Sequence, residues 1–186
     1  IHNERPVPLS HSLYVANNIY TIVDPAKKKN GLPEFNDSKL ELAQVKMRAP
    51  RGKNDKPNNP KNAKNKDRPY NPMLSARYWP DLVLNLKKND LLPALLFSFS
   101  IKKCEEYARY CIRNVKFLSS SEQNYVTEFF YKTIRRLPEH DRKLPQINQM
   151  LELLKCGIGV HHSGILPILR ETVEILLSDG YLKALF

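Results

Sequence analysis

Twice in the second half of this chain, a short apolar run is followed directly by an amphipathic helical pattern. The first run covers residues 94–99, and apolar residues then recur at helical spacing over 104–115. The second covers residues 158–161 and precedes the same spacing over 165–177. A continuous apolar run is typical of a strand buried on both faces. Strands that alternate with helices predict parallel pairing, so we expect a doubly wound α/β sheet.

Weaker signals predict the remaining elements. Alternating residues on the two sides of Asn17-Asn18 predict a hairpin, and residues 24–32 are expected to form a loop. Weak helical periodicity covers residues 37–47. Three further helices are expected to start near Pro80, after Ser119-Ser120-Ser121, and near Pro145, the last of them ending at Gly157.

Positive charge is concentrated in one segment. The chain of 186 residues carries a net charge of +11, the balance expected of a nucleic-acid partner. Residues 46–68 hold nine Lys or Arg against Asp55 and Asp67, a local charge of +7. This segment is rich in Asn and Pro and has almost no large apolar side chain, so we predict a disordered basic insertion. The alternative is an RNA-contacting or localisation patch.

Several classes of protein are disfavoured. No apolar run approaches the roughly 18 residues that a membrane span needs, and residues 1–6 lack the pattern of a secretory signal. We therefore expect no membrane partner. The three cysteines form no CxxC pair, which favours reduced thiols inside a cell, in the cytoplasm or the nucleus.

A phosphate site is expected where the first apolar run ends. The hydroxyls of Ser98 and Ser100, the lysines Lys102 and Lys103, and the free N–H groups of the helix start could meet one anion. Ligands favour the carboxyl ends of parallel strands, where this site would lie. The alternative is a helix capped by serine, with both lysines simply in solvent.

A second site is expected in the loop that follows the second run. Imidazole and hydroxyl groups of His161, His162 and Ser163, together with Gly164, could reach a sugar or phosphate oxygen. Adjacent histidines on a strand face opposite ways, and no further ligand has the spacing of a zinc site, so no metal is expected. The loop also lacks the G-x-S-x-G elbow of serine hydrolases. Histidines that only satisfy loop carbonyls remain an alternative.

The sequence lacks the parts that bind a nucleoside triphosphate. There is no G-x-x-x-x-G-K-[ST] phosphate loop, and Gly52-Lys53-Asn54 is only a fragment of that pattern. No pair of carboxylates follows an apolar strand to hold Mg²⁺. We expect no catalytic residue here, and ATP and Mg would be bound mainly by regions outside this sequence.

Three blocks of the chain resemble the second RecA-like domain of superkiller-type, exosome-assisting DExH-box RNA helicases. They are Arg5-Pro6-Val7-Pro8-Leu9, residues 95–100 with Cys104-Glu105-Glu106, and residues 144–186. The resemblance implies that residues 1–186 are the N-terminal part of that domain, a RecA-like doubly wound parallel sheet with flanking helices that lacks its C-terminal strands. The segment 46–68 would be an insertion in it.

The resemblance also implies a function. Such helicases use ATP to move 3′ to 5′ on RNA and feed the exosome, so single-stranded RNA, superkiller complex subunits and the exosome are the expected partners. It places Ser98, Ser100, His162 and Ser163 on the RNA side. Ile101 stands where relatives often carry arginine, which shifts one phosphate contact to Lys102 or Lys103. Ser163 favours the cytoplasmic branch over the nuclear one.

Two other functions are compatible with the same residues. One is a catalytically silent RNA-binding or protein-docking domain that kept a helicase-like fold. The other is a DNA helicase of related build, against which the exosome-like block over residues 144–171 argues.

Overall fold

The chain is described here by a computed structural model, which covers residues 9–29, 32–48 and 76–186. They belong to two compact units, Ile1–Tyr70 and Asn71–Phe186. From position 49 on, the predicted insertion lies outside the described residues, as does the block Arg5 to Pro8. One partial domain over residues 1–186 stays a prediction.

The first unit is a three-stranded antiparallel sheet with one helix. Its strands are β1 (His11–Val15), β2 (Asn18–Lys29) and β3 (Leu32–Phe35), in the order β1-β2-β3. The helix α1 (Asp37–Arg48) packs on β1 and β2 and buries Ala43. The predicted hairpin and the helix over 37–47 are confirmed.

Two details of this unit differ from the sequence-based expectation. The hairpin turn is at Ala16 and Asn17, both with positive φ, one residue earlier than predicted. The loop predicted over 24–32 is wrong, because β2 continues to Lys29 and Lys28 pairs with Pro33 of β3. Main-chain pairing needs no apolar side chain, so a polar segment can extend a strand when its partner strand is antiparallel.

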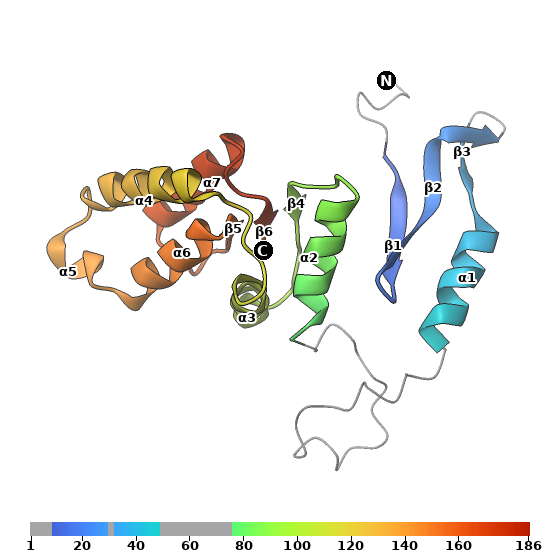
Figure 1. Ribbon diagram of the computed structural model, residues 1–186, viewed down its shortest axis with the longest axis horizontal. Coiled ribbons are helices and arrows are strands. Elements are labelled where there is room, and N and C mark those ends of the chain that lie inside the picture. The colour runs from blue at the N-terminus through green and yellow to red at the C-terminus, as the bar shows by residue number, and fades with distance from the viewer. Residues whose placement is uncertain (1–8, 30–31, 49–75) are drawn as a thin grey trace, which may run out of the picture. The chain divides into compact units, whose positions relative to one another are not determined.

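The second unit places helices around a small parallel sheet (Figure 1). The strands β4 (Ala94–Leu95), β5 (Ile158–Gly159) and β6 (Ala184–Leu185) pair in the order β4-β6-β5, and both pairs are parallel. The helices are α2 (Tyr78–Lys88), α3 (Ile101–Ile112), α4 (Ser120–Ile134), α5 (Glu139–Arg142), α6 (Pro145–Lys155) and α7 (Pro167–Ser178). The predicted α/β class with parallel strands is confirmed.

Local sequence sets the ends of these helices. The hydroxyl of Ser100 accepts a hydrogen bond from the Lys103 N–H at the start of α3. At the start of α4, Ser119 and Glu122 form a reciprocal capping box, and the hydrogen bonds from Ser119 hold the pKa of the Glu122 carboxyl below its ordinary value. Gly157 follows α6 with φ of +75°, the left-handed conformation that ends a helix.

The core of this unit joins both ends of its sequence. The ring of Trp79 on α2 stacks on Tyr107 of α3 at 4.2 Å and meets Phe186 edge-on at 5.7 Å. The predicted apolar faces of α3, α4 and α6 are buried, including Cys104, Ala108, Cys111, Val126, Phe130, Ile134, Ile147, Met150 and Leu154. Burial of these side chains is the main force that fixes the strands against the helices.

The first apolar run does not form the central strand that the sequence predicts. Only Ala94 and Leu95 enter the ladder, and β4 is an outer strand of the described sheet. Alternate side chains from Leu95 to Ile101 are exposed: Leu95 at 56%, Phe97 at 89%, Phe99 fully and Ile101 at 48%. An apolar pattern indicates which faces of a segment are suited to burial. Here no described residue packs over the face that carries Phe97 and Phe99.

This exposed face predicts self-association. Replacing both Phe97 and Phe99 by Ser removes two aromatic side chains from the surface, so we expect a smaller fraction of oligomer in sedimentation velocity. The matched control is Leu84→Ser, a single exposed apolar residue on α2, which we expect to change nothing. Equal oligomer content in both variants and the unchanged chain would contradict the expectation.

Candidate nucleic-acid interface

The two predicted sites lie at the same edge of the parallel sheet. β4 and β5 run parallel to the strand β6 between them, so the segments after both strands leave at the carboxyl edge. Backbone bonds extend the pairing there: the Leu96 N–H donates to the Leu185 carbonyl at 2.7 Å, and the His161 N–H donates to the Phe186 carbonyl at 2.8 Å. Both runs contribute to one sheet, and β6 lies between them.

The first site is built on the start of α3. The Ser98 hydroxyl accepts from the Ser100 N–H at 3.4 Å, and the Ser100 hydroxyl accepts from the Lys103 N–H at 3.4 Å. Lys102 and Lys103 are both exposed. The Ser98–Ser100 segment is therefore a helix cap with two solvent-facing cations beside it, which fits both the predicted phosphate site and the plain capped helix.

The second site is the loop after β5, which residues 161–164 form. The His162 ring folds back onto the loop, where its Nδ1 accepts a hydrogen bond from the Gly164 N–H at 3.2 Å. The His162 carbonyl also accepts from the Ile165 N–H at 3.1 Å. Ser163 and Gly164 are the exposed members of the loop, whereas the side chain of His162 is only 9% exposed. The residues that face solvent are thus Ser163 and Gly164.

A carboxylate of α3 links the two sites. Oε1 of Glu105 lies 3.4 Å from Nε2 of His162, a contact whose geometry is not that of a hydrogen bond. Because Nδ1 of the ring accepts from Gly164, Nε2 is the ring nitrogen that remains as a donor, and it has no hydrogen-bond partner among the described residues. Glu105 also pairs with Arg109, one turn along α3, at 3.7 Å. The structure therefore brings the loop against the helix that carries Lys102 and Lys103.

His161 points toward a different helix. Its Nε2 lies 2.6 Å from Oε1 of Glu174 on α7. The two histidines thus face opposite ways, as expected, and each contacts a carboxylate of a different helix.

Gln146, near the start of α6, holds the far end of the loop. Its Nε2 donates to the Gly164 carbonyl at 3.0 Å, and its Oε1 accepts from the Leu166 N–H at 3.0 Å. One planar amide therefore satisfies a backbone acceptor and a backbone donor of the loop. Leu166 precedes α7, so the same amide fixes where that helix begins.

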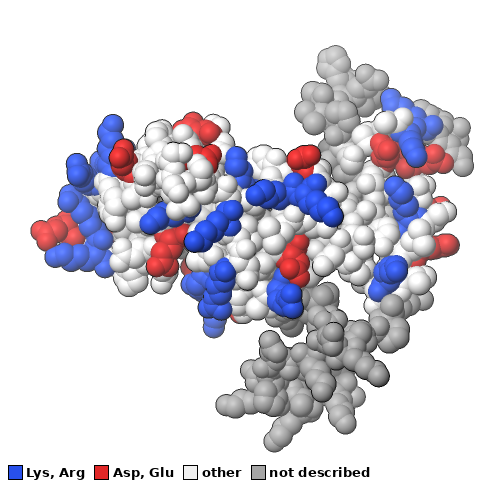
Figure 2. Space-filling view, in the orientation of Figure 1, with Lys and Arg blue, Asp and Glu red and all other residues white. Residues whose placement is uncertain are grey.

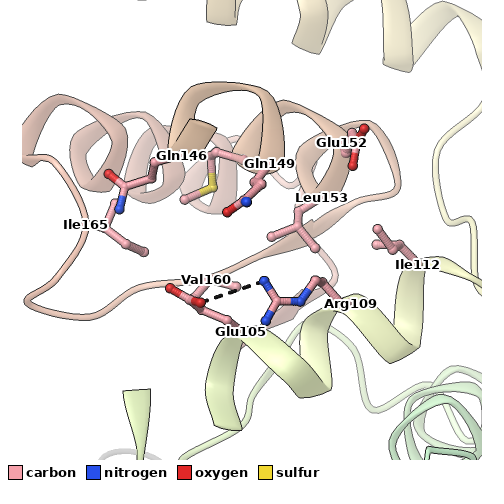
Figure 3. A pocket seen from close by; sticks show the side chains of 10 residues that line it. Glu105, Arg109, Ile112, Gln146, Gln149, Glu152, Leu153, Val160 and Ile165 are labelled. Atoms are coloured by element: carbon pink, nitrogen blue, oxygen red, sulfur yellow. Dashed lines mark ion pairs between the residues drawn. The ribbon is translucent and has the colours of Figure 1, made fainter. Parts of the chain in front are cut away.

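A shallow groove separates α3 from α6 beside this loop (Figure 3). Glu105, Arg109 and Ile112 line it from α3, and Gln146, Gln149 and Leu153 line it from α6. Its volume is about 50 Å³, against roughly 300–1,000 Å³ for pockets that take small ligands. The groove is a narrow gap between two packed helices and is too small for a nucleotide.

The described residues offer little support for covalent or metal chemistry. Burial raises the pKa of the Cys111 thiol to about 12 and also raises that of Cys156, so neither is an activated nucleophile. No three His, Cys, Asp or Glu side chains in the described parts of the chain gather to hold a metal ion. None of the helices within those parts is long and apolar enough to cross a bilayer.

Basic side chains are spread over the second unit and form no single patch on the face seen in Figure 2. Acidic side chains lie among them. The electrostatic attraction for a polyanion therefore has to come from particular clusters, of which Lys102 and Lys103 at the sheet edge are one.

The sequence-based reasoning missed the two side chains that support the loop. Glu105 and Gln146 were named only within the blocks that resemble a helicase family, without a role in the loop. Gln146 lies 18 and 20 residues before its two partners, so no local periodicity could reveal the contact. Whether Ser98, Ser100, Lys102, Lys103 and residues 161–164 contact RNA stays a prediction.

Comparison with known proteins agrees with the predicted resemblance. No family model matches the chain. Antiviral helicase SKI2 of Saccharomyces cerevisiae is 46% identical over 112 residues, which are 60% of this chain and 9% of that protein. Exosome RNA helicase MTR4 of Homo sapiens is 46% identical over 105 residues, 56% of this chain and 10% of that protein.

A third relative matches nearly the whole chain. DExH-box ATP-dependent RNA helicase DExH9 of Arabidopsis thaliana is 35% identical over 185 residues, 98% of this chain and 18% of that protein. The chain thus spans less than a fifth of the length of each of these relatives. The predicted recognition is confirmed: this chain is homologous to a segment of the exosome-associated DExH-box RNA helicases represented by SKI2 and MTR4.

Proposed function

We propose that this chain is part of an ATP-dependent 3′ to 5′ RNA helicase of exosome-linked RNA decay, and that it supplies contacts to the RNA backbone. In this proposal residues 1–186 belong to a second RecA-like domain. Single-stranded RNA is the substrate, superkiller complex subunits and the exosome are the partners, and the cytoplasm is the site of action. The names of the relatives support the helicase class and the link to the exosome.

One observation carries the proposal. The loop over residues 161–164 and the start of α3 lie at one sheet edge and are linked through the Glu105–His162 contact. Lys102 and Lys103 of the first segment and Ser163 of the second are exposed to solvent. Cations and hydroxyls bind phosphate and sugar oxygens without reading bases, which suits a motor that must move along any RNA sequence.

In this proposal, ATP and Mg are bound mainly by the longer protein of which this chain is a part, here called the parent protein. This sequence has no phosphate loop, and the groove beside the site is too small for a nucleotide. ATP would be bound mainly by other parts of the protein. The residues of this chain would hold RNA while hydrolysis elsewhere supplies the energy for movement.

Binding of a fluorescein-labelled oligouridine by the chain tests the proposal. We expect Lys102→Ala with Lys103→Ala to weaken binding at low salt by about tenfold. Each lost phosphate contact should also reduce the slope of log affinity against log salt by about 0.7. The charge-matched control is Lys132→Ala with Lys155→Ala, two exposed lysines near the ends of α4 and α6. Fluorescence anisotropy over a series of salt concentrations measures both quantities.

Two outcomes would contradict the assignment. One is equal loss in the control pair, which would mean that only total charge matters. The other is complete loss of binding on deletion of residues 47–67 with no effect of the two lysines at the sheet edge, which would move the RNA surface to the basic insertion. RNA-stimulated ATP hydrolysis by the parent protein separates a motor from a catalytically silent RNA-binding domain.

A further inference from the structure

The loop over residues 161–166 has few bonds of its own. Within it, the Gly164 N–H donates to His162 Nδ1 and the Ile165 N–H donates to the His162 carbonyl. Both bonds have His162 as the acceptor, so they stabilise the turn in the first half of the loop. The second half, which contains the Gly164 carbonyl and the Leu166 N–H, is held from outside by the amide of Gln146.

The pattern of these two bonds suits the side-chain amide of Gln146. The Gly164 carbonyl requires a donor and the Leu166 N–H requires an acceptor, and the side chain of Gln146 supplies both at 3.0 Å. A carboxylate has no donor at neutral pH, and an apolar side chain has neither group. Gln146 thus donates one hydrogen bond to the loop backbone and accepts one from it, as the backbone of a neighbouring strand would.

We propose that Gln146 is a positioning residue that sets the conformation in which Ser163 and Gly164 are presented to RNA. This inference rests on the proposed function, because it assumes that the loop contacts RNA. Gln146 itself would make no RNA contact. Its effect reaches the RNA through the backbone of Gly164 and Leu166, on the two sides of Ile165.

Burial makes the loop conformation sensitive to this residue. The Ile165 side chain is only 4% exposed and packs in the core. A Cβ added to its neighbour Gly164 would lie 3.3 Å from Nδ1 of the His162 ring. When the Gln146 bonds are lost, the anchored Ile165 keeps the loop attached, but the Gly164 carbonyl and the Leu166 N–H lose the bonds that orient them. The expected defect is therefore in loop geometry rather than in overall folding.

Three substitutions at position 146 and nearby separate positioning from a general helix effect. Gln146→Ala removes both bonds, and we expect RNA affinity to fall about fivefold, the factor that one ordinary hydrogen bond represents. Gln146→Glu keeps the acceptor but sets a carboxylate oxygen against the Gly164 carbonyl, so an equal or larger loss is expected. A carboxylate near a helix N-terminus otherwise stabilises the helix, so Gln146→Glu raises stability if the residue serves only α6. Gln149→Ala, one turn along the same helix, is the matched control.

A double-mutant cycle with Ser163→Ala shows whether Gln146 acts through the loop. We expect Gln146→Ala to weaken binding less in the Ser163→Ala background than in the unchanged chain, since both act on one contact. Amide hydrogen exchange at Leu166 should be faster in Gln146→Ala and unchanged in Gln149→Ala. Thermal melting of each variant detects loss of folding.

The failures of the two proposals can be told apart. If Ser163→Ala and the Lys102 and Lys103 substitutions leave RNA binding unchanged, the proposed RNA edge is wrong. If these substitutions weaken binding but Gln146→Glu binds RNA as the unchanged chain does, the RNA edge stands and the positioning role of Gln146 is overturned. Additive losses in the cycle also overturn it.

Discussion

Phe130→Ala is expected to lower the free energy of unfolding of the second unit by about 3–5 kcal/mol, the range for removing a large buried aromatic side chain. Phe130 is fully buried on α4, which packs against both α6 and α7. These two helices flank the loop that contains His162 and Ser163. Urea unfolding followed by fluorescence measures the loss, because the single tryptophan, Trp79, lies in the core of this unit.

The neighbouring residue provides the control. Tyr131 follows Phe130 on the same helix but is 52% exposed, so Tyr131→Ala should cost less than about 1 kcal/mol. Losses of similar size in the two variants would mean that α4 does not present Phe130 to the core in solution.

Gly157→Ala is expected to destabilise the same unit by about 2–4 kcal/mol, from backbone strain and overpacking together. Gly157 has φ of +75°, which costs other residues roughly 1–2 kcal/mol. An added Cβ would also lie 3.0 Å from Cβ of Phe117. Because the Gly157 carbonyl accepts from the Lys183 N–H at 2.8 Å, any shift here disturbs the pairing of β5 with β6.

Gly180→Ala separates the two causes. Gly180 has nearly the same φ, +79°, but nothing lies within 4 Å of an added Cβ. Its substitution should therefore show the backbone strain alone, about 1–2 kcal/mol. The difference between the two variants in urea unfolding measures the crowding at Gly157, and equal losses would contradict a role for Phe117.

Much of the second unit follows from local rules. Serine caps at Ser100 and Ser119, prolines in the first turns of α6 and α7, and left-handed glycines after them each act within a few residues, so their effect is visible in the sequence. The buried faces of α3, α4 and α6 follow from helical periodicity in the same way.

Contacts between residues far apart in the sequence could not be predicted from local patterns. The apolar run at residues 94–99 has the composition of a strand covered on both faces, yet composition does not say which neighbours supply the cover. Strand order is equally hidden, since β6 inserts between two strands that precede it in sequence. The loop support from Gln146 depends on how α6 and the loop pack, which no local pattern encodes.

The position of β6 has a consequence for synthesis of the protein. Both segments of the proposed RNA edge precede this strand in the chain, so during synthesis they lack a shared scaffold until residues 184 and 185 have been made. The sheet edge that carries both segments can therefore assemble only after β6 has been made.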